Sequence, residues 1–205
     1  MGKPQRISIF PLAGALLFPG MQLPLHVFEP RYRALVRDAM ARDRKIGMIQ
    51  PRDNGPVPAL FDVGCIGRVG DIEALEDGRF NIVLTGIARF KVKRELDVTT
   101  PFRQVEALVE AEDIEDIALA PIERASLERE SRRFAEAQGY LVDWTAVTRL
   151  DDAALVNGIA QVVPFDAASK QALLEAPTLK ERAERAIQLM QFFGRTDEDG
   201  PSTLQ

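Results

Sequence analysis

The chain has 205 residues, 46% of them hydrophobic and 28% charged, a composition typical of folded globular proteins. Its net charge of −5 argues against DNA and RNA as partners, because clustered Lys and Arg side chains supply most of the affinity for a phosphate backbone. The single cysteine excludes a disulfide within the chain and favours a reducing, cytoplasmic location.

The amino-terminal stretch is an interrupted apolar pattern rather than a targeting signal. Lys3 and Arg6 precede an apolar run, as in a secretion signal, but Pro11 interrupts the run. Apolar pieces separated by prolines continue beyond it, as in a folded core. No run in the chain reaches the roughly 18 apolar residues that a membrane span needs. We therefore expect neither a secretion signal nor a membrane-spanning segment.

The first 110 residues have mostly the pattern of β-strands, with one helix. Three short apolar runs separated by Pro and Gly predict strands at residues 9–12, 17–18 and 23–28. A helix is expected from Pro30, because Pro lacks an N–H and suits a first helical position. One face of this helix is apolar at Tyr32, Leu35, Val36, Ala39 and Met40.

Four further strands are predicted at residues 45–50, 63–75, 80–93 and 105–109. Asp77-Gly78 lies between two of them and predicts a tight hairpin, because glycine adopts a positive φ at little cost. Gly86 is expected to break the third strand. The second contains recurring glycines, which predict the bulges or bends of a small barrel, at Gly64, Gly67 and Gly70.

The rest of the chain has the period of helices. An acidic run at residues 110–116 is interpreted as a solvated linker or the entry to a helix, since a cation site would need oxygen ligands at defined spacing. Helices are then predicted at residues 121–138, 152–163, 167–175 and 179–194. Thr178 and Glu181 form a capping box before the last helix. The first helix has only a thin apolar stripe, made by Leu127, Phe134 and Leu141.

These patterns divide the chain into three parts. Residues 1–116 are expected to form a β-rich subdomain and residues 117–195 a helical subdomain. The polar residues 196–205 are expected to be a disordered tail.

Few residues suit catalysis or metal binding. His26 is the single histidine, and sequence spacing identifies no partner for it, so a strand-end histidine is favoured over a general base or a metal ligand. Cys65 lies in an apolar strand and is interpreted as a small buried hydrophobe. One His and one Cys cannot build a Cys/His zinc site. No P-loop or nucleophile-elbow pattern occurs. We expect no catalytic residue, no metal, no cofactor and no enzymatic activity.

One predicted strand carries four basic residues, Arg89, Lys91, Lys93 and Arg94. Binding of a single-stranded nucleic acid needs aromatic side chains interleaved with the basic ones on the exposed face. Phe90 alternates to the opposite face, so the basic residues are interpreted as a solvated strand face.

Two long stretches of this sequence resemble a known family. They are IFPLAGALLFPGMQLPLHVFEPRYRALVRDAM at residues 9–40 and FDVGCIGRVGDIEALEDGRFNIVLTGIARFKV at residues 61–92. Both resemble the LON substrate-binding domain, the amino-terminal domain of ATP-dependent Lon proteases. PTLKERAERAIQLMQFF at residues 177–193 resembles the helical part that follows it there. The resemblance extends over roughly residues 7–195.

The resemblance implies an α+β fold, in which a PUA-like β pseudo-barrel with a short helix precedes a carboxy-terminal helical bundle. It implies a non-enzymatic protein- or peptide-binding module that recognises unfolded or degron-bearing proteins, without the ATPase and protease parts of Lon. A homo-oligomer is left open. Two alternatives also stay open: an RNA-binding module, because PUA-like folds often bind RNA, and a small-molecule-binding protein or hydrolase with His26 in a pocket.

The binding surface is expected within residues 9–36, as an apolar groove or as a strand edge to which a peptide strand is added. The candidate contacts are Leu16, Met21, Phe28 and Tyr32. Apolar residues at regular spacing more often pack inward, so a contiguous exposed apolar patch would favour this hypothesis.

Overall fold

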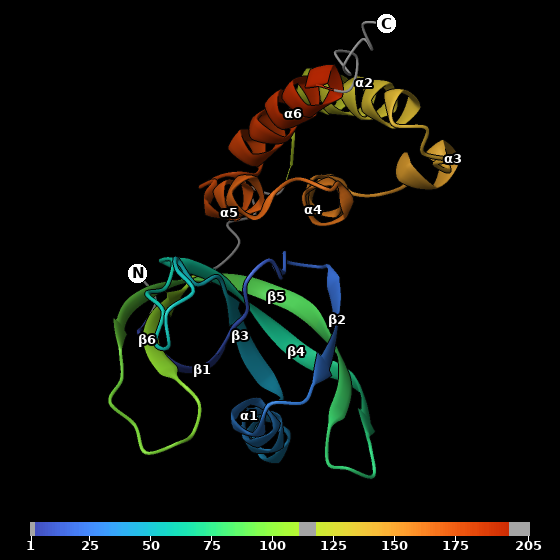
Figure 1. The fold of residues 1–205 in the computed structure, drawn as a ribbon. Helices are drawn as coiled ribbons and strands as arrows, with labels where there is room; N and C mark the ends of the chain where they lie inside the picture. The colour runs from blue at the N-terminus through green and yellow to red at the C-terminus, as the bar shows by residue number, and fades with distance from the viewer. Residues whose placement is uncertain (1–2, 111–117, 197–205) are drawn as a thin grey trace, which may run out of the picture. The chain divides into compact units, whose positions relative to one another are not determined.

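The computed structural model describes residues 3–110 and 118–196, with side chains as far as Gly194, and forms two compact units (Figure 1). The units are Met1–Glu112 and Asp113–Gln205. The predicted boundary at residue 116 falls in 111–117, and the predicted tail falls largely in 197–205; both ranges lie outside the described residues. The division at residue 116 and the disordered tail stay predictions.

The first unit is a six-stranded sheet with one helix. Its elements are β1 (Gln5–Pro11), β2 (Gln22–Val27), α1 (Pro30–Ala41), β3 (Lys45–Ile49), β4 (Val63–Ala74), β5 (Phe80–Glu95) and β6 (Gln104–Val109). The strand order is β2-β5-β4-β3-β1-β6, and β5 also pairs with β6. Strands β1, β3, β4, β5 and β6 therefore form a closed ring, with β2 paired to β5 outside it. The β1–β3 pair is parallel, and the other pairs are antiparallel.

Strand β5 closes the ring because it bends without ending. The prediction that Gly86 breaks this strand is wrong: the strand runs on to Glu95, and the ladder with β4 skips Ile87. An extra residue of this kind kinks a strand and increases its twist. The amino-terminal half of β5 can therefore pair with β2, and its carboxy-terminal half with β6.

The ring encloses an apolar core, and α1 covers a second one. The enclosed cluster consists of Ile7, Ile9, Ile49, Ile66, Phe90, Val105 and Ala107. The predicted apolar face of α1 is confirmed for its buried residues, Tyr32, Leu35, Val36 and Ala39. The strand predicted at residues 17–18 is wrong. Leu17 and Phe18 are buried, but residues 12–21 form a loop, whose Leu12 and Gly20 N–H groups donate to the carbonyls of Ile49 and Gly86.

The second unit is helical. It contains α2 (Pro121–Ala137), α3 (Trp144–Val147), α4 (Asp152–Val162), α5 (Ala167–Glu175) and α6 (Leu179–Thr196), and α6 packs against α2, α4 and α5. The predicted role of Thr178 as a cap is confirmed, since its Oγ1 accepts the Glu181 backbone N–H at 3.1 Å. Among the described residues, no helix is both long and apolar enough to cross a membrane.

One prediction for this unit is wrong, and one helix was not predicted. Leu141 is not part of the apolar stripe of α2, because the helix ends at Ala137 and the chain turns at Gly139 with a φ of +70°. Leu141 is therefore fully exposed. The short helix α3 has no counterpart in the predicted elements, because it is a single turn held by Asp143, whose carboxylate accepts the backbone N–H groups of Thr145 and Ala146.

Candidate functional site

The helical unit contains a large apolar groove. Its volume is about 860 Å³, and it is lined by α2, the segment that follows it, α3, α4 and Met190 of α6. The largest side chains in its wall include Phe134, Tyr140, Leu141, Trp144, Leu155 and Val162. Ser131 at its edge donates its hydroxyl to the Leu127 carbonyl, so this polar group is already satisfied by α2.

One wall of the groove is formed by a segment whose side chains are mostly exposed. Residues 139–150, which we call the flap, contain no buried residue, and only Trp144 and Val147 are even half-buried. The exposed fraction of Leu141 is 103%, and that of Val162 on the facing helix α4 is 79%. Contiguous exposed apolar surface of this kind usually marks an interaction site.

Polar contacts hold the flap at its start. The Tyr140 N–H donates to the Ala135 carbonyl at 2.8 Å, which fixes the turn at Gly139. Further along, the guanidinium of Arg132 lies 4.4 Å from the ring centroid of Trp144, a cation–π contact between α2 and α3.

Arg124 of α2 holds the end of the flap. Its Nη2 donates to the Leu150 carbonyl at 2.9 Å, and its Nη1 lies 2.5 Å from Asp152 Oδ1. Burial would raise the pKa of Asp152, but the Leu119 N–H and the Arg124 guanidinium outweigh it and hold the pKa below its ordinary value. Because polar anchors position the flap, its apolar side chains remain available to a partner.

The four predicted contact residues lie in the first unit and are not equally accessible. Leu16 and Tyr32 are buried; the Tyr32 ring stacks on Phe10 at a centroid distance of 4.0 Å, and its hydroxyl donates to the Pro11 carbonyl at 3.2 Å. Met21 is half-buried, and Phe28 is 60% exposed. Their role in binding stays a prediction, and only Met21 and Phe28 reach solvent in this conformation.

His26 belongs to a chain of hydrogen bonds across three strands. Its Nδ1 is 2.7 Å from Asn81 Oδ1, and its Nε2 is 3.2 Å from Arg79 Nη1. Asn81 in turn donates its Nδ2 to Glu73 at 2.7 Å. An Nδ1–H tautomer satisfies both ring contacts, because Nδ1 then donates and Nε2 accepts. The ring links β2 to Asn81 of β5 and to Arg79 of the hairpin, and Asn81 continues the chain to Glu73 of β4. This suits a structural role better than that of a general base paired with a carboxylate.

Two of the four basic residues of the basic strand are neutralised by ion pairs. Arg89 pairs with Glu110, and Arg94 pairs with Glu106, both at 2.7 Å. Cys65 is buried, as predicted. In the part of the chain that the structure describes, no cluster of three His, Cys, Asp or Glu side chains could hold a metal ion.

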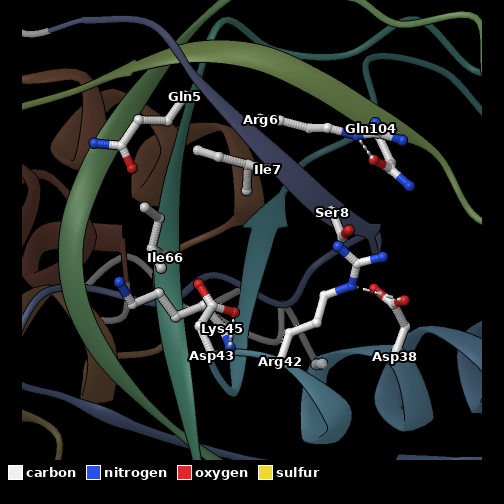
Figure 2. Close-up of a pocket in the computed structure, with 11 residues that line it drawn as sticks. Gln5, Arg6, Ile7, Ser8, Asp38, Arg42, Asp43, Lys45, Ile66 and Gln104 are labelled. Atoms are coloured by element: carbon white, nitrogen blue, oxygen red, sulfur yellow. Dashed lines mark hydrogen bonds and ion pairs between the residues drawn. The ribbon is translucent and has the colours of Figure 1, made fainter.

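A second, polar pocket lies in the first unit, between β1, the carboxy-terminal end of α1 and the start of β3 (Figure 2). Its volume is about 410 Å³. Figure 2 shows Arg6 beside Gln104 and Arg42 beside Asp38, while Lys45 extends on the side of Ile66. Ion pairs and side-chain amides make this pocket unlike the apolar groove.

The groove was not predicted from the sequence. The pattern that could have indicated it is the apolar run Tyr140-Leu141-Val142, which directly follows the helix-ending Gly139. Such a run can equally begin a buried element, and the position of α4 opposite the flap depends on packing against α6.

Nearly the whole chain is similar to one family of known proteins. A family model described as ATP-dependent protease La (LON) substrate-binding domain matches residues 6–191. Lon protease 2 of Myxococcus xanthus is 30% identical over 201 residues, which cover 91% of this chain and 24% of that protein. Lon protease of Escherichia coli (strain K12) is 24% identical over 198 residues, with coverages of 90% and 24%. The chain thus spans about a quarter of the length of these relatives.

Two solved structures share the fold. A Lon N-terminal domain protein from Xanthomonas campestris superposes with a TM-score of 0.67 at 24% identity, covering 92% of this chain and 98% of that one. The N-terminal domain of Lon protease from the Mycobacterium avium complex gives a TM-score of 0.69 at 18% identity, with coverages of 91% and 98%. The mixed α/β architecture of the two units is therefore that of Lon N-terminal domains.

Proposed function

Because this chain belongs to the family of LON substrate-binding domains, we propose that it is a binding module for protein segments that expose apolar side chains. The observation that carries the proposal is the apolar groove of the helical unit, with the uncovered side chains of the flap at its edge. Folded proteins bury most of their large apolar side chains, whereas unfolded or degron-bearing segments present them. The groove therefore favours such segments over folded surfaces.

Binding in the groove would be driven by removing apolar surface from water. Leu141 is fully exposed, so a partner that covers it gains the transfer free energy of a whole leucine side chain, about 1.5–3 kcal/mol. Trp144 and Tyr140 add broad rings with few rotatable bonds, which lose little entropy when they are covered.

The alternative mode, addition of a peptide strand to a sheet edge, has weaker support. Among the strands that the structure describes, β2 pairs only with β5, so its other edge is open. Pro24 lies in the middle of this strand, and proline has no backbone N–H to offer an added strand. We therefore place the binding surface in the groove rather than at this edge.

The role that we propose is binding without catalysis. ATP hydrolysis and peptide cleavage belong to the full-length relatives, of which this chain matches about a quarter, and no reaction is assigned to the described residues. The closed ring of strands supports a PUA-like pseudo-barrel, and the packing of α6 on α2, α4 and α5 supports a helical bundle. The pairing of Arg89 with Glu110 and Arg94 with Glu106 weakens the RNA-binding alternative.

Replacing Leu141 by Asp is expected to weaken binding of an unfolded protein about tenfold or more, because a charged group replaces an apolar contact. The measurement is fluorescence anisotropy of a labelled, reduced and carboxymethylated protein titrated with the full chain. Folding should be unaffected, since Leu141 is fully exposed.

Ile122→Asp is the matched control. Ile122 is also an exposed apolar residue of this unit, at 74%, but it does not line the groove, and an acidic residue suits the first turn of α2. Val162→Lys should reproduce the loss from the opposite wall. Equal binding by the Leu141→Asp and Ile122→Asp variants would contradict the assignment of the groove.

A further inference from the structure

Helix α1 and the residues that follow it are rich in basic side chains. Residues 30–45 carry six basic and two acidic side chains in a chain whose net charge is −5. The cations at the end of α1 and on the adjacent strands form what we call the Lys45 patch: Arg6, Arg42, Arg44, Lys45 and Arg68. Arg6, Arg42 and Lys45 line the polar pocket (Figure 2).

Two members of the patch oppose each other across the sheet. Lys45 of β3 and Arg68 of β4 are Cα partners in an antiparallel ladder, so their side chains leave the same face. Like charges placed directly opposite destabilise a strand pair. Within residues 3–110 and 118–194, neither side chain has an ion pair. The fold therefore holds together two cations that repel each other.

Arg44 adds a third cation at a strained position. Its φ is +60°, the left-handed region that glycine or asparagine occupies at lower cost, and its carbonyl accepts the Val69 N–H at 2.8 Å. This contact places the Arg44 backbone beside the strand that carries Arg68. A cation therefore occupies a position where the backbone favours a different residue.

The cations of the patch outnumber the carboxylates near it. Asp38 is paired with Arg42 at 3.0 Å, and Asp43 accepts the Lys45 backbone N–H at 3.2 Å and keeps its own charge. Glu106, the cross-strand partner of Arg6, is held by Arg94. Arg44 and Arg68 are exposed, and Lys45 is half-buried in the pocket wall, so the five cations leave the patch positive.

We propose that the Lys45 patch docks an acidic segment of a partner polypeptide, with its carboxylates received by Lys45, Arg68 and Arg44. This goes beyond the apolar groove, since it assigns a second surface, in the other unit, with a different chemistry. A segment rich in Asp and Glu is favoured over a nucleic acid because the patch has only five cations, few for a continuous phosphate backbone. Separate carboxylates can be taken up one by one by guanidinium forks.

The test uses the full chain and a short fluorescein-labelled peptide of alternating Glu and Ser, with a Gln-Ser peptide as the neutral probe. The Lys45→Gln/Arg68→Gln variant should bind the acidic peptide about tenfold more weakly, and its affinity should depend less on salt. Its melting temperature should stay equal to that of the parent chain or rise, because a repulsion is removed.

Lys91→Gln/Lys93→Gln is the matched control, because it removes the same charge from exposed positions of β5. It should keep parental affinity. The proposal is overturned if both double variants lose affinity equally, if the Gln-Ser peptide binds as well as the acidic one, or if the parent chain binds neither. If the parent chain bound a single-stranded RNA more tightly than the acidic peptide, and the Lys45→Gln/Arg68→Gln variant lost that binding, the ligand of the patch would be a nucleic acid and not an acidic polypeptide. The Leu141→Asp variant should bind the acidic peptide with unchanged affinity. The proposal for the Lys45 patch and the proposal for the apolar groove can therefore fail independently.

Discussion

Replacing Arg182 by alanine is expected to lower the free energy of unfolding of the helical unit by about 3–5 kcal/mol, enough to unfold it in part. Arg182 is only 5% exposed and joins three helices. Its Nη1 donates to Asn157 Oδ1 of α4 at 2.7 Å, and its Nε donates to the Leu173 carbonyl of α5 at 3.0 Å.

The effect is large because Arg182 caps the end of α5. Arg182 donates to the carbonyls of Leu173, which also accepts the Ala176 N–H at 3.3 Å, and of Ala176 just after the helix. Each buried acceptor that loses this charged donor costs about 1–3 kcal/mol, and the lost side chain leaves a cavity as well.

Urea unfolding followed by tryptophan fluorescence measures this change, because the single tryptophan, Trp144, lies in the helical unit. Arg185→Ala is the control on the same helix: its guanidinium reaches the Ala172 carbonyl at 2.8 Å but is solvent-exposed, so we expect a loss of about 1 kcal/mol or less. Similar losses for the two variants would show that Arg182 does not join the helices.

The second large effect is expected in the sheet, where Gly64→Ala should destabilise the first unit by about 3 kcal/mol. A Cβ at Gly64 would lie 2.5 Å from Phe90 Cζ and even closer to the Met48 carbonyl oxygen of the neighbouring strand. Both neighbours are fixed, because Phe90 is fully buried in the ring and Met48 O is backbone. The methyl group has no space into which it can relax.

Gly70→Ala provides the comparison in the same strand. Its nearest neighbour would be the Val83 carbonyl oxygen at 3.6 Å, an ordinary contact, so we expect a change within about 0.5 kcal/mol. Thermal unfolding followed by circular dichroism separates the two variants. Equal melting temperatures would mean that the enclosed core of the ring has room for an added methyl group at Gly64.

Local chemistry explains what the sequence predicted well. The hairpin at Asp77-Gly78 depends on one glycine with a φ of +79°, and α4 begins at Asp151, whose carboxylate accepts the Ala154 N–H at 2.7 Å. These features depend on a few neighbouring residues, so they can be predicted from sequence patterns. The apolar face of α1 was predictable for the same reason.

Features that depend on distant residues were not predictable. Strand β5 continues past Gly86 because β6 pairs with its second half, and no local pattern shows that pairing. Phe18 has the same apolar chemistry in a loop as it would have in a strand. Likewise, Tyr32 and Phe28 are both aromatic candidates in sequence, and only the packing of α1 decides that one is buried and the other exposed.

The candidate site shows this limit most clearly. The resemblance in residues 9–40 identified the family, yet the apolar groove lies in the helical unit. Its walls come from α2, the flap and α4, which α6 brings together. Helical periodicity shows which face of each helix is apolar, but not which apolar side chains stay uncovered.

Hydrogen–deuterium exchange of the full chain, with and without a saturating unfolded protein, tests the central claim most directly. The groove predicts slower exchange of backbone amides within residues 131–164, including the flap, and unchanged exchange around Met21 and Phe28. Protection confined to the first unit, with the flap exchanging as fast as in the free chain, would contradict the groove and return the binding surface to residues 9–36.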